Sequence, residues 1–449
     1  MKSYRFKALL QNKNWIENAT VAIDEAGKIV SISQTEQTDS IFIDGYALPG
    51  FQNAHSHAFQ YAMAGLAENH SGNDDFWSWR EMMYGLALDI NPDKLKKIAA
   101  MLYAELLITG YSNVAEFHYV HHDKNGEPYE NLAEMGEALI EAAQIAGIKI
   151  TLIPIFYQKG GFGIAPNERQ KRFISKTFED YARLFEASAK VCEKYQNANI
   201  AVGIHSMRGV DAKDILRAAG ELPKDIPFHI HVSEQLKEVA DCVKFLGMRP
   251  VEWLLENLEL NERFHLVHAT HLTETETENL AKSKANVVLC PSTEGKLGDG
   301  IFPLSNYQKS GGNWSIGTDS HIGLNPFEEL RILDYEQRLI SHRRNTFSGE
   351  KISDSGLFAI TKATVSGRKA MNNFERDFFA VGADFDACVI EANAPLLISV
   401  KTENLASVII YTADASNIYG TFVKGNLIRK DENYEQIKDE FIGCVKEFR

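Results

Sequence analysis

The sequence has few cysteines, no long apolar run and no excess of basic residues. Its five cysteines are widely spaced and include no CxxC pair, so we expect reduced thiols and no disulfide framework or cysteine-based zinc site. No run approaches the roughly 18 apolar residues of a membrane span, and the apolar stretch near the N-terminus is too short for a secretory signal. The formal net charge of −14 argues against nucleic acid, whose phosphates require clustered Lys and Arg. We therefore expect a cytoplasmic protein that binds neither nucleic acid nor membranes.

Short β-type runs alternate with helical patterns along the middle of the chain. The helices predicted over Asp93–Thr109 and Leu132–Ala146 each stop at a glycine, Thr273 and Glu276 form a capping box, and Pro326 opens another helix. This alternation predicts a (β/α)8 barrel of the TIM type. A doubly wound open sheet is the alternative, but it usually has fewer strands and a glycine-rich phosphate loop. The eight expected strands are Ala54–Ala58, Tyr111–Tyr119, Ile148–Phe156, Ile200–Ser206, Phe228–Glu234, Phe264–Thr270, Ala285–Thr293 and Trp314–His321.

The two flanks of the chain contain short strand-like segments. Neither flank is long enough for a robust core of its own, so we expect residues 1–49 and 376–449 to pair as one small β-sandwich domain beside a barrel domain of residues 50–375. The segments are Ala8–Gln11, Thr20–Asp24, Ile29–Ser33, Ala387–Glu391, Val408–Tyr411 and Gly420–Leu427.

Histidines and one aspartate stand where the expected strands end. His55 and His57 form a His-x-His pair, and residues i and i+2 of a strand share a face about 7 Å apart, so both imidazoles can face one metal ion. His231 and His268 close the fifth and sixth strands, and Asp319 closes the eighth. The carboxyl ends of the strands form the catalytic face of such a barrel. A lone His-x-His is weak evidence, but the conjunction predicts a metal site.

The residue types also indicate which metal would bind. Imidazoles with one carboxylate and no thiolate suit Zn²⁺ and tolerate Fe²⁺ or Mn²⁺. A second metal would need a bridging group from the fourth strand, commonly a carboxylated Lys. The fourth expected strand has no Lys, and His205 stands near its end. We therefore expect one divalent metal ion, with Zn²⁺ favoured and an open position for water.

These residues resemble the amidohydrolase superfamily, in particular its mononuclear deaminase-like branch. The resemblance spans nearly the whole chain, from PGFQNAHSH at residues 49–57 to HVSE at residues 231–234, His268 and the Thr-Asp-Ser at residues 318–320. It implies a metal bound by the strand-one and strand-five histidines and the strand-eight aspartate. The implied ligands are His55, His57, His231 and Asp319.

Within that branch, several segments look like those of formimidoylglutamate deiminases. Residues 57–68, 115–122 and 292–302 carry this likeness, and the unusual FWSWR at residues 76–80 discriminates best. Nucleobase deaminases usually have an Asn where Thr293-Glu294 stands here. One departure is Ile204-His205-Ser206 in place of Pro-His-Ser, where we expect a local backbone difference and no change of role. Such enzymes hydrolyse N-formimino-L-glutamate to N-formyl-L-glutamate and ammonia in histidine degradation.

The mechanism and substrate contacts follow from this resemblance and from residue chemistry. A metal-activated water would attack the formimino carbon. Asp319 and His268 would accept its proton or polarise the developing oxyanion, and Glu234 would carry a proton to the departing nitrogen. The substrate would be small and acidic, and arginine suits its carboxylates. The expected substrate-binding residues are Gln60, Arg80, Tyr119, His205 and Arg208.

Three other functions stay open on the sequence alone. The nearest is a related deaminase acting on a guanidine or an amino-heterocycle such as guanine, although two arginines favour an acidic substrate over a neutral purine. A hydrolase that opens an imidazolone ring is the second. A catalytically silent barrel serving as a binding scaffold is the third, yet such a protein would be expected to have lost ligand residues. We expect a homodimer from the base rate for such barrels.

Overall fold

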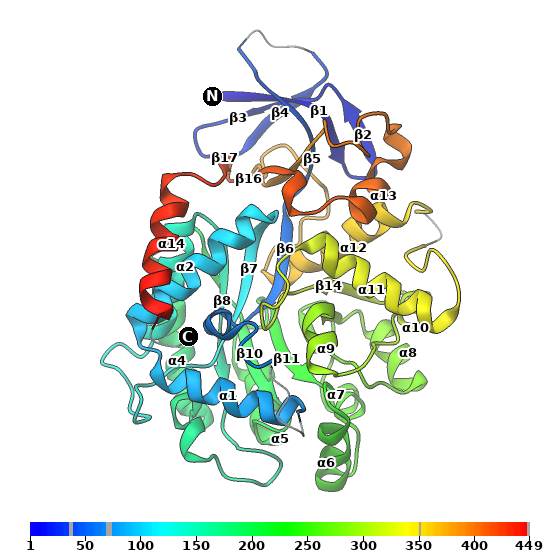
Figure 1. Ribbon diagram of the computed structural model, residues 1–449. Coiled ribbons are helices and arrows are strands. Elements are labelled where there is room, and N and C mark those ends of the chain that lie inside the picture. Colours follow the sequence, from blue (N-terminus) through cyan, green and yellow to red (C-terminus); the bar gives the residue numbers. More distant parts are fainter. Residues whose placement is uncertain (36–38, 69–73, 350–351, 447–449) are drawn as a thin grey trace.

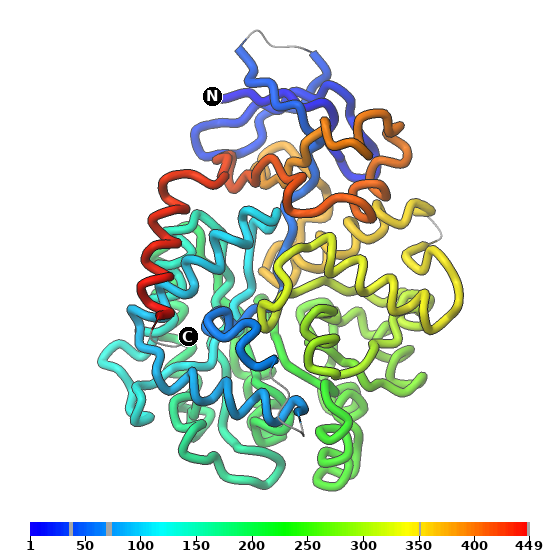
Figure 2. The backbone as a smooth tube through the Cα atoms, in the orientation of Figure 1, coloured from blue at the N-terminus to red at the C-terminus, as the bar shows by residue number. Residues whose placement is uncertain are grey.

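The computed structural model describes residues 1–35, 39–68, 74–349 and 352–446. The middle of the chain builds one β-sheet and the two ends together build another. Figure 1 shows the terminal sheet above the barrel, and the tube in Figure 2 shows how the chain passes from one to the other.

The central sheet is the predicted eight-stranded parallel barrel. Its strands follow the order β6-β7-β8-β10-β11-β12-β13-β14, and the short β9 also pairs with β8. Almost every residue of these strands is buried, which is typical of parallel strands covered on both faces. The strands are β6 (Phe51–Ser56), β7 (Tyr111–His118), β8 (Lys149–Phe156), β9 (Ala198–Ile200), β10 (Val202–Ser206), β11 (Phe228–Val232), β12 (Phe264–His268), β13 (Asn286–Leu289) and β14 (Asn313–Ile316).

The loop that follows β14 closes the barrel against β6. The backbone amides of Thr318 and Asp319 donate to the carbonyl of His55 at 3.1 and 3.0 Å. The Asn53 side chain donates to Thr318 Oγ1 at 2.7 Å. This close approach needs Gly317, where an added Cβ would lie 2.7 Å from the Cβ of His55. The closure therefore brings the carboxyl ends of the first and last barrel strands together.

Helices connect the barrel strands and cover the outside of the sheet (Figure 1). The predicted helices form, and the capping box of α8 is confirmed, with each of Thr273 and Glu276 accepting from the other's backbone amide. The helices are α1 (Phe76–Asp89), α2 (Pro92–Ile108), α3 (Glu134–Ala146), α4 (Phe178–Cys192), α5 (Ala212–Glu221), α6 (Leu236–Leu246), α7 (Pro250–Asn257), α8 (Glu274–Ser283), α9 (Pro291–Leu297), α10 (Leu304–Lys309), α11 (Pro326–Ser341) and α12 (Ser355–Ala370), with the 3-10 helices η1 (Ala58–Met63) and η2 (Glu168–Phe173).

The strand predicted over Ala285–Thr293 is shorter than expected. It ends at Leu289 because Pro291 occupies the first turn of α9, where its missing N–H costs nothing. The end of the predicted strand is therefore helical, and α9 places Glu294 beside the carboxyl ends of the barrel strands.

The terminal sheet is built from both ends of the chain, as expected for the small β-sandwich. Its order is β17-β16-β15-β5-β1-β3-β4, with β2 paired to β1, and only β1 and β5 run parallel. The predicted segment Gly420–Leu427 forms a hairpin of two strands. The elements are β1 (Lys2–Gln11), β2 (Asn14–Glu17), β3 (Thr20–Ile23), β4 (Ile29–Ser33), β5 (Ile41–Pro49), β15 (Ala387–Glu391), β16 (Ile418–Val423), β17 (Asn426–Ile428), η3 (Ala415–Asn417) and the helices α13 (Thr402–Thr412) and α14 (Glu432–Val445).

The strand predicted over Val408–Tyr411 is wrong, because this segment lies inside helix α13. Leu405, Ala406, Ile409 and Ile410 are all buried on one face of that helix. This spacing is that of an amphipathic helix, and packing of that face overrides the β propensity of the Val-Ile-Ile run. In the described ranges, no helix is both long and apolar enough to cross a membrane.

Candidate active site

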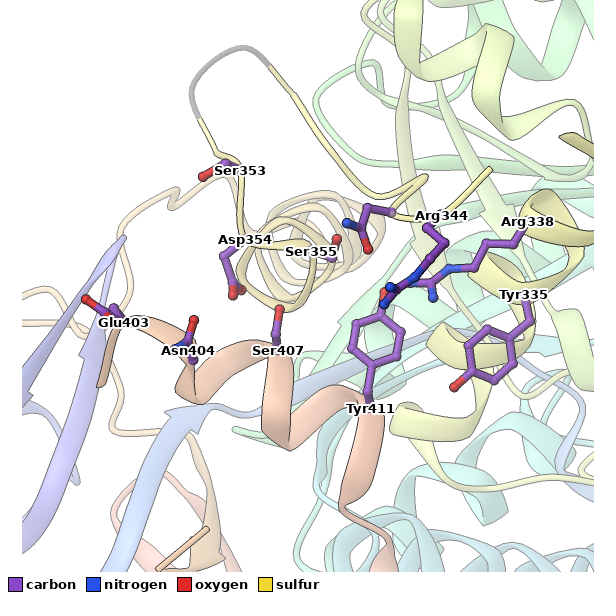
Figure 3. A pocket seen from close by; sticks show the side chains of 11 residues that line it. Tyr335, Arg338, Arg344, Ser353, Asp354, Ser355, Glu403, Asn404, Ser407 and Tyr411 are labelled. Atoms are coloured by element: carbon purple, nitrogen blue, oxygen red, sulfur yellow. The ribbon is translucent and has the colours of Figure 1, made fainter. Parts of the chain in front are cut away.

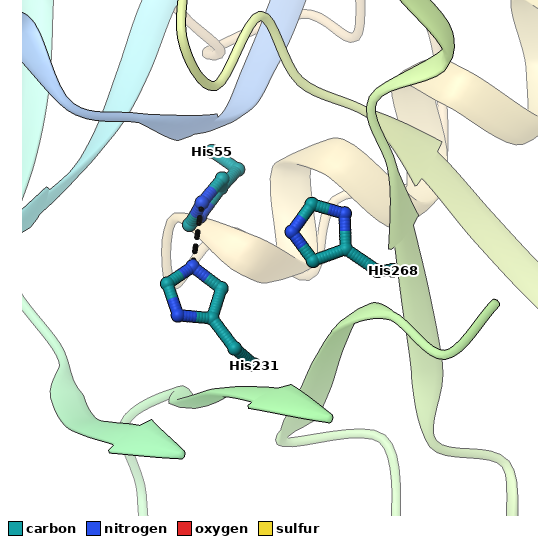
Figure 4. Close-up of side chains that lie close together, drawn as sticks. All are labelled: His55, His231 and His268. Atoms are coloured by element: carbon teal, nitrogen blue, oxygen red, sulfur yellow. Dashed lines mark hydrogen bonds between the residues drawn. The ribbon is translucent and has the colours of Figure 1, made fainter. Parts of the chain in front are cut away.

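Four predicted metal ligands meet at the carboxyl ends of the barrel strands. His55 Nε2 lies 3.2 Å from His57 Nε2 and 3.0 Å from His231 Nε2. Figure 4 shows the His55 and His231 rings with this second contact as a dashed line, and His268 beside them. Asp319 Oδ1 lies 3.5 Å from His55 Nε2 and 3.3 Å from His57 Nε2. All four side chains are buried. The structure therefore brings these residues from β6, β11 and the segment after β14 to one point.

The three imidazoles are in the state that binds metal. His57 Nδ1 donates to the carbonyl of Phe117 at 2.8 Å, which leaves the Nε2 lone pair facing inward. Burial lowers the pKa of His57 to about 3, and burial also lowers the pKa of His55 and His231. The side chains are therefore neutral near pH 7, and a neutral imidazole is the ligand form. Among the described residues, Nδ1 of His55 and of His231 has no hydrogen-bond partner.

Two residues of the cluster have backbone conformations that L-residues rarely adopt. His268 has φ of 67° and Asp319 has φ of 46°, and such conformations cost on the order of 1–3 kcal/mol each. Burial alone would raise the pKa of Asp319, but its interactions with His55, His57 and His268 outweigh it and hold the pKa well below the usual value. Asp319 is therefore ionised where the strained backbone aims it at the histidines.

His268 lies among three carboxylates. Its Nε2 is 3.8 Å from Glu234 Oε1 and 3.8 Å from Asp319 Oδ2, while its Nδ1 is 3.1 Å from Glu294 Oε1. Burial alone would lower the pKa of His268, but Glu234, Glu294 and Asp319 outweigh it and raise the pKa to about 10. The contact between His268 and Glu294 was not predicted from the sequence. The one signal there is Thr293-Glu294 itself, which stands where nucleobase deaminases usually have an Asn.

The predicted catalytic and substrate-binding residues line one cavity with the metal cluster. Of all the predicted site residues, only His55, which is fully buried, is absent from the lining. The cavity is also lined by aromatic and apolar side chains from α1 and the end of α9. The lining residues are His57, Gln60, Phe76, Trp79, Arg80, Met83, Tyr84, Tyr119, His205, Arg208, His231, Glu234, His268, Leu297 and Asp319.

Two arginines give the cavity its positive charge. Arg80 stacks its guanidinium over Trp77 at 4.5 Å from the ring centre. Arg208 forms ion pairs with Glu234 at 3.2 Å and with Glu238 at 2.9 Å. The Nε atoms of both arginines are buried and lack hydrogen-bond partners within the described part of the chain. Each arginine therefore has a donor left for a bound anion.

Neutral hydrogen-bonding groups line the same cavity as the arginines and the metal cluster. Gln60 Nε2 donates to Tyr119 Oη at 2.9 Å, and Gln60 Oε1 is buried without a partner among the described residues. The ring of His205 stacks on Tyr157 with centroids 4.0 Å apart, and burial lowers its pKa well below the usual value. His205 is therefore a neutral, orientated group near pH 7.

A second hollow lies between α11, α13 and the start of α12 (Figure 3). It contains none of the predicted site residues. Arg338 in this hollow is paired with Asp334 at 2.5 Å, and among the described residues no candidate metal-ligand group includes a residue that lines it. The predicted site residues therefore belong to the barrel cavity and not to this hollow.

Comparisons with known proteins support the same assignment. A family model described as the amidohydrolase family matches residues 46–428. The chain is 38% identical to a formimidoylglutamate deiminase of Pseudomonas aeruginosa over 428 residues, which cover 95% of this chain and 94% of that protein. It is 25% identical to a 5-methylthioadenosine/S-adenosylhomocysteine deaminase of Halobacterium salinarum, over 94% of this chain and 91% of that protein.

Solved structures have the same architecture. An amidohydrolase from Brucella melitensis matches with a TM-score of 0.93 and 36% identity, covering 100% of this chain and 99% of that one. An adenosine deaminase from Xanthomonas campestris with bound zinc matches with a TM-score of 0.78 and 21% identity over 98% of each chain, which shows a shared fold. The chain therefore belongs to the amidohydrolase family, whose members bind a divalent metal, and it is a hydrolase that acts on C–N bonds.

Proposed function

We propose that this protein hydrolyses N-formimino-L-glutamate to N-formyl-L-glutamate and ammonia. The observation that carries the proposal is a pair of arginines, Arg80 and Arg208, in the cavity that contains the His and Asp cluster. A glutamyl substrate has two carboxylates, and arginine binds carboxylates in a bidentate manner. The 38% identity to a formimidoylglutamate deiminase over nearly the whole chain supports this substrate class.

The donor set fits one divalent metal ion, for which we propose Zn²⁺. His55, His57, His231 and Asp319 would hold it, because His57 Nε2, His231 Nε2 and Asp319 Oδ1 all lie within 3.5 Å of His55 Nε2, and three neutral imidazoles with a carboxylate suit zinc. The Xanthomonas neighbour, described with bound zinc, supports the same choice. When bound, the metal supplies the Lewis acidity that activates water for attack on the formimino carbon.

The proton transfers are assigned to side chains of this chain. Asp319 is ionised and accepts a hydrogen bond from the attacking water. His268 carries a proton on Nδ1 toward Glu294, so its Nε2 faces the developing oxyanion. Glu234 lies 3.8 Å from His268 Nε2. It takes up the two protons that the water loses, one on attack and one as the tetrahedral centre collapses, and passes each to the nitrogen that leaves as ammonia. A tetrahedral centre that loses ammonia then gives the N-formyl product.

The substrate is orientated by groups that do not react. Arg80 and Arg208 bind its two carboxylates, and Gln60, Tyr119 and His205 donate or accept neutral hydrogen bonds. The stacking of Arg80 on Trp77 and of His205 on Tyr157 fixes two of these groups before substrate arrives. The arginines also disfavour a neutral purine, which has no carboxylate to accept from the buried Nε donors of Arg80 and Arg208.

The test is ammonia release from N-formimino-L-glutamate by zinc-loaded protein, with the second product identified by mass. Ammonia together with N-formyl-L-glutamate, at a kcat/KM of roughly 10⁴ M⁻¹s⁻¹ or above, supports the proposal. Formamide with glutamate would reverse the leaving group and contradict the role of Glu234. No turnover, with zinc confirmed in the protein, would refute this substrate, and guanine and guanidines form the next panel.

Two variants separate the metal from the proton-transfer step. His231→Ala removes a ligand and should abolish zinc binding along with activity. Glu234→Gln keeps all four proposed ligands, so zinc content should match that of the parent while turnover is lost. A Glu234→Gln protein with parental turnover would show that another group carries the proton.

A further inference from the structure

Arg208 is held by two carboxylates at once. Its Nη2 lies 3.2 Å from Glu234 Oε2, and its Nη1 lies 2.9 Å from Glu238 Oε2. Glu238 Oε2 also accepts a hydrogen bond from the backbone amide of Glu234 at 3.1 Å. Glu238 belongs to helix α6, its side chain is fully buried, and it stands outside the cavity lining. Glu238 therefore contacts the Arg208 side chain and the backbone amide of Glu234 from outside the cavity.

The remaining donor of Arg208 defines where an anion can bind. A guanidinium presents its N–H groups in a fixed fork, and Nε shares one edge of that fork with Nη2. Within the described ranges, Nε and Nη1 of Arg208 are both buried without a hydrogen-bond partner, but Nη1 is held in the 2.9 Å ion pair with Glu238, whereas no carboxylate is paired with Nε. Glu234 fills only the Nη2 half of this edge. A carboxylate that binds the whole edge in a bidentate manner must therefore replace Glu234 at Nη2.

We propose that Glu238 is a positioning residue that holds Arg208 at Nη1 while a carboxylate of the substrate replaces Glu234 at Nη2. This inference rests on the proposed function, which supplies the acidic substrate. The released Glu234 then becomes free to serve the leaving nitrogen, and its Oε1 already lies 3.8 Å from His268 Nε2. Recognition of the acidic substrate and release of Glu234 become a single event.

Glu238 is required because Arg208 is buried. With Glu238 absent, Glu234 would be the remaining anion on a desolvated guanidinium, and an ion pair in a low-dielectric site is strong when it lacks competitors. Arg208 would then keep Glu234 and give it up to the substrate less readily. With Glu238 present, Arg208 is paired with two carboxylates. Only Glu234 can be displaced, because Glu238 Oε2 is also hydrogen-bonded to the backbone amide of residue 234.

The test measures binding of N-formyl-L-glutamate, the proposed product, to zinc-loaded protein by calorimetry. Glu234→Gln removes the anion that must be displaced, so the affinity should rise at least fivefold. Glu238→Gln leaves Glu234 on Arg208, so the affinity should fall at least fivefold, and kcat for N-formimino-L-glutamate should fall at least tenfold. Simple removal of a negative charge near Arg208 would raise the affinity in both variants, so the opposite signs identify the exchange.

Glu276→Gln is the matched control. Glu276 is also a buried partner of an arginine, with Oε2 2.7 Å from Arg249 Nε, but it lies outside the cavity. Its variant should bind and turn over as the parent does. If Glu238→Gln does not fold, Glu238→Asp, which keeps the charge but shortens the side chain, is expected to weaken binding in the same direction.

The outcomes separate the two proposals. Equal or higher affinity in the Glu238 variant, or unchanged kcat, overturns the positioning role and leaves the proposed function intact. A parent protein that neither binds N-formyl-L-glutamate nor hydrolyses N-formimino-L-glutamate overturns the proposed function, and the positioning role falls with it.

Discussion

Replacement of Gly317 by Ala tests whether barrel closure sets the geometry of the metal site. The added Cβ would lie 2.7 Å from the Cβ of His55 and 2.9 Å from its backbone nitrogen and oxygen. Gly317 does not have a positive φ, so the whole effect is steric. The end of β6 and the segment after β14 have to separate by about 0.7 Å before the closest pair reaches ordinary contact at 3.4 Å.

A displacement of this size should weaken metal binding strongly but lower the stability of the fold only moderately. Overpacking of a buried position typically costs about 1–3 kcal/mol, so the protein should still fold, with a lowered unfolding temperature. Metal–ligand distances tolerate only about 0.2 Å, and the displaced backbone carries His55 on one side and Asp319 on the other. We therefore expect zinc affinity to fall at least tenfold and kcat to fall with it.

Zinc affinity is measured by competition with a chelator, and folding by circular dichroism and thermal unfolding. Gly220→Ala is the control, because nothing lies within 4 Å of an added Cβ there and the residue is inside helix α5. That variant should be as stable as the parent or slightly more stable. Parental zinc affinity in Gly317→Ala would refute the argument that this contact sets the ligand geometry.

Three further predictions concern acid stability, the metal and the substrate. Burial lowers the pKa of His229 to about 3, whereas the unfolded value is near 6.5, so the unfolded state binds the extra proton between these values. The stability contributed by neutral His229 is fully present above pH 6.5 and is lost as the pH falls toward 3, with a loss of about 2 kcal/mol by pH 5. Chemical unfolding at pH 7 and pH 5 should show that the His229→Gln protein lacks this loss. An equal pH dependence of the unfolding free energy in parent and variant would contradict the prediction. Removal of metal by a chelator should abolish turnover, and zinc should restore it, as followed by ammonia release. Arg80→Met should raise KM for N-formimino-L-glutamate at least tenfold with a smaller change in kcat, and steady-state kinetics with unchanged KM would show that Arg80 binds no carboxylate.

The barrel could be predicted because its signal repeats along the chain. Each strand is a short buried apolar run, and the chemistry-bearing residues stand at or near the carboxyl ends of the runs, as His231 and His268 do in β11 and β12. Position at a strand end is a property of the linear sequence, and parallel pairing converts it into proximity in space. The same logic failed for Val408–Tyr411, because the choice between strand and helix there depends on which face is buried by tertiary packing.

Partners of the site residues were harder to find than the site residues themselves. Glu238 looks like an ordinary polar position of an amphipathic helix, and nothing local indicates that its side chain meets Arg208, which follows a different strand. Glu294 had a weak signal in the unusual Thr-Glu pair, but its contact with His268 depends on helix α9 starting at Pro291. Such contacts join elements that are distant in sequence, so local patterns do not specify them.

Closure of the barrel through the segment after β14 also sets an order of events during biosynthesis. The hydrogen bond between Asn53 and Thr318 joins residues 265 positions apart, and translation at roughly 5–20 residues per second separates their appearance by more than ten seconds. Until residues 318 and 319 have been synthesised, Asp319 is not beside His55 and His57, and the end of β6 lacks the backbone partner that closes the barrel. A nascent or truncated chain that ends before residue 319 therefore lacks one of the four proposed ligands. Acquisition of the metal ion becomes a late, post-translational step that marks a finished barrel.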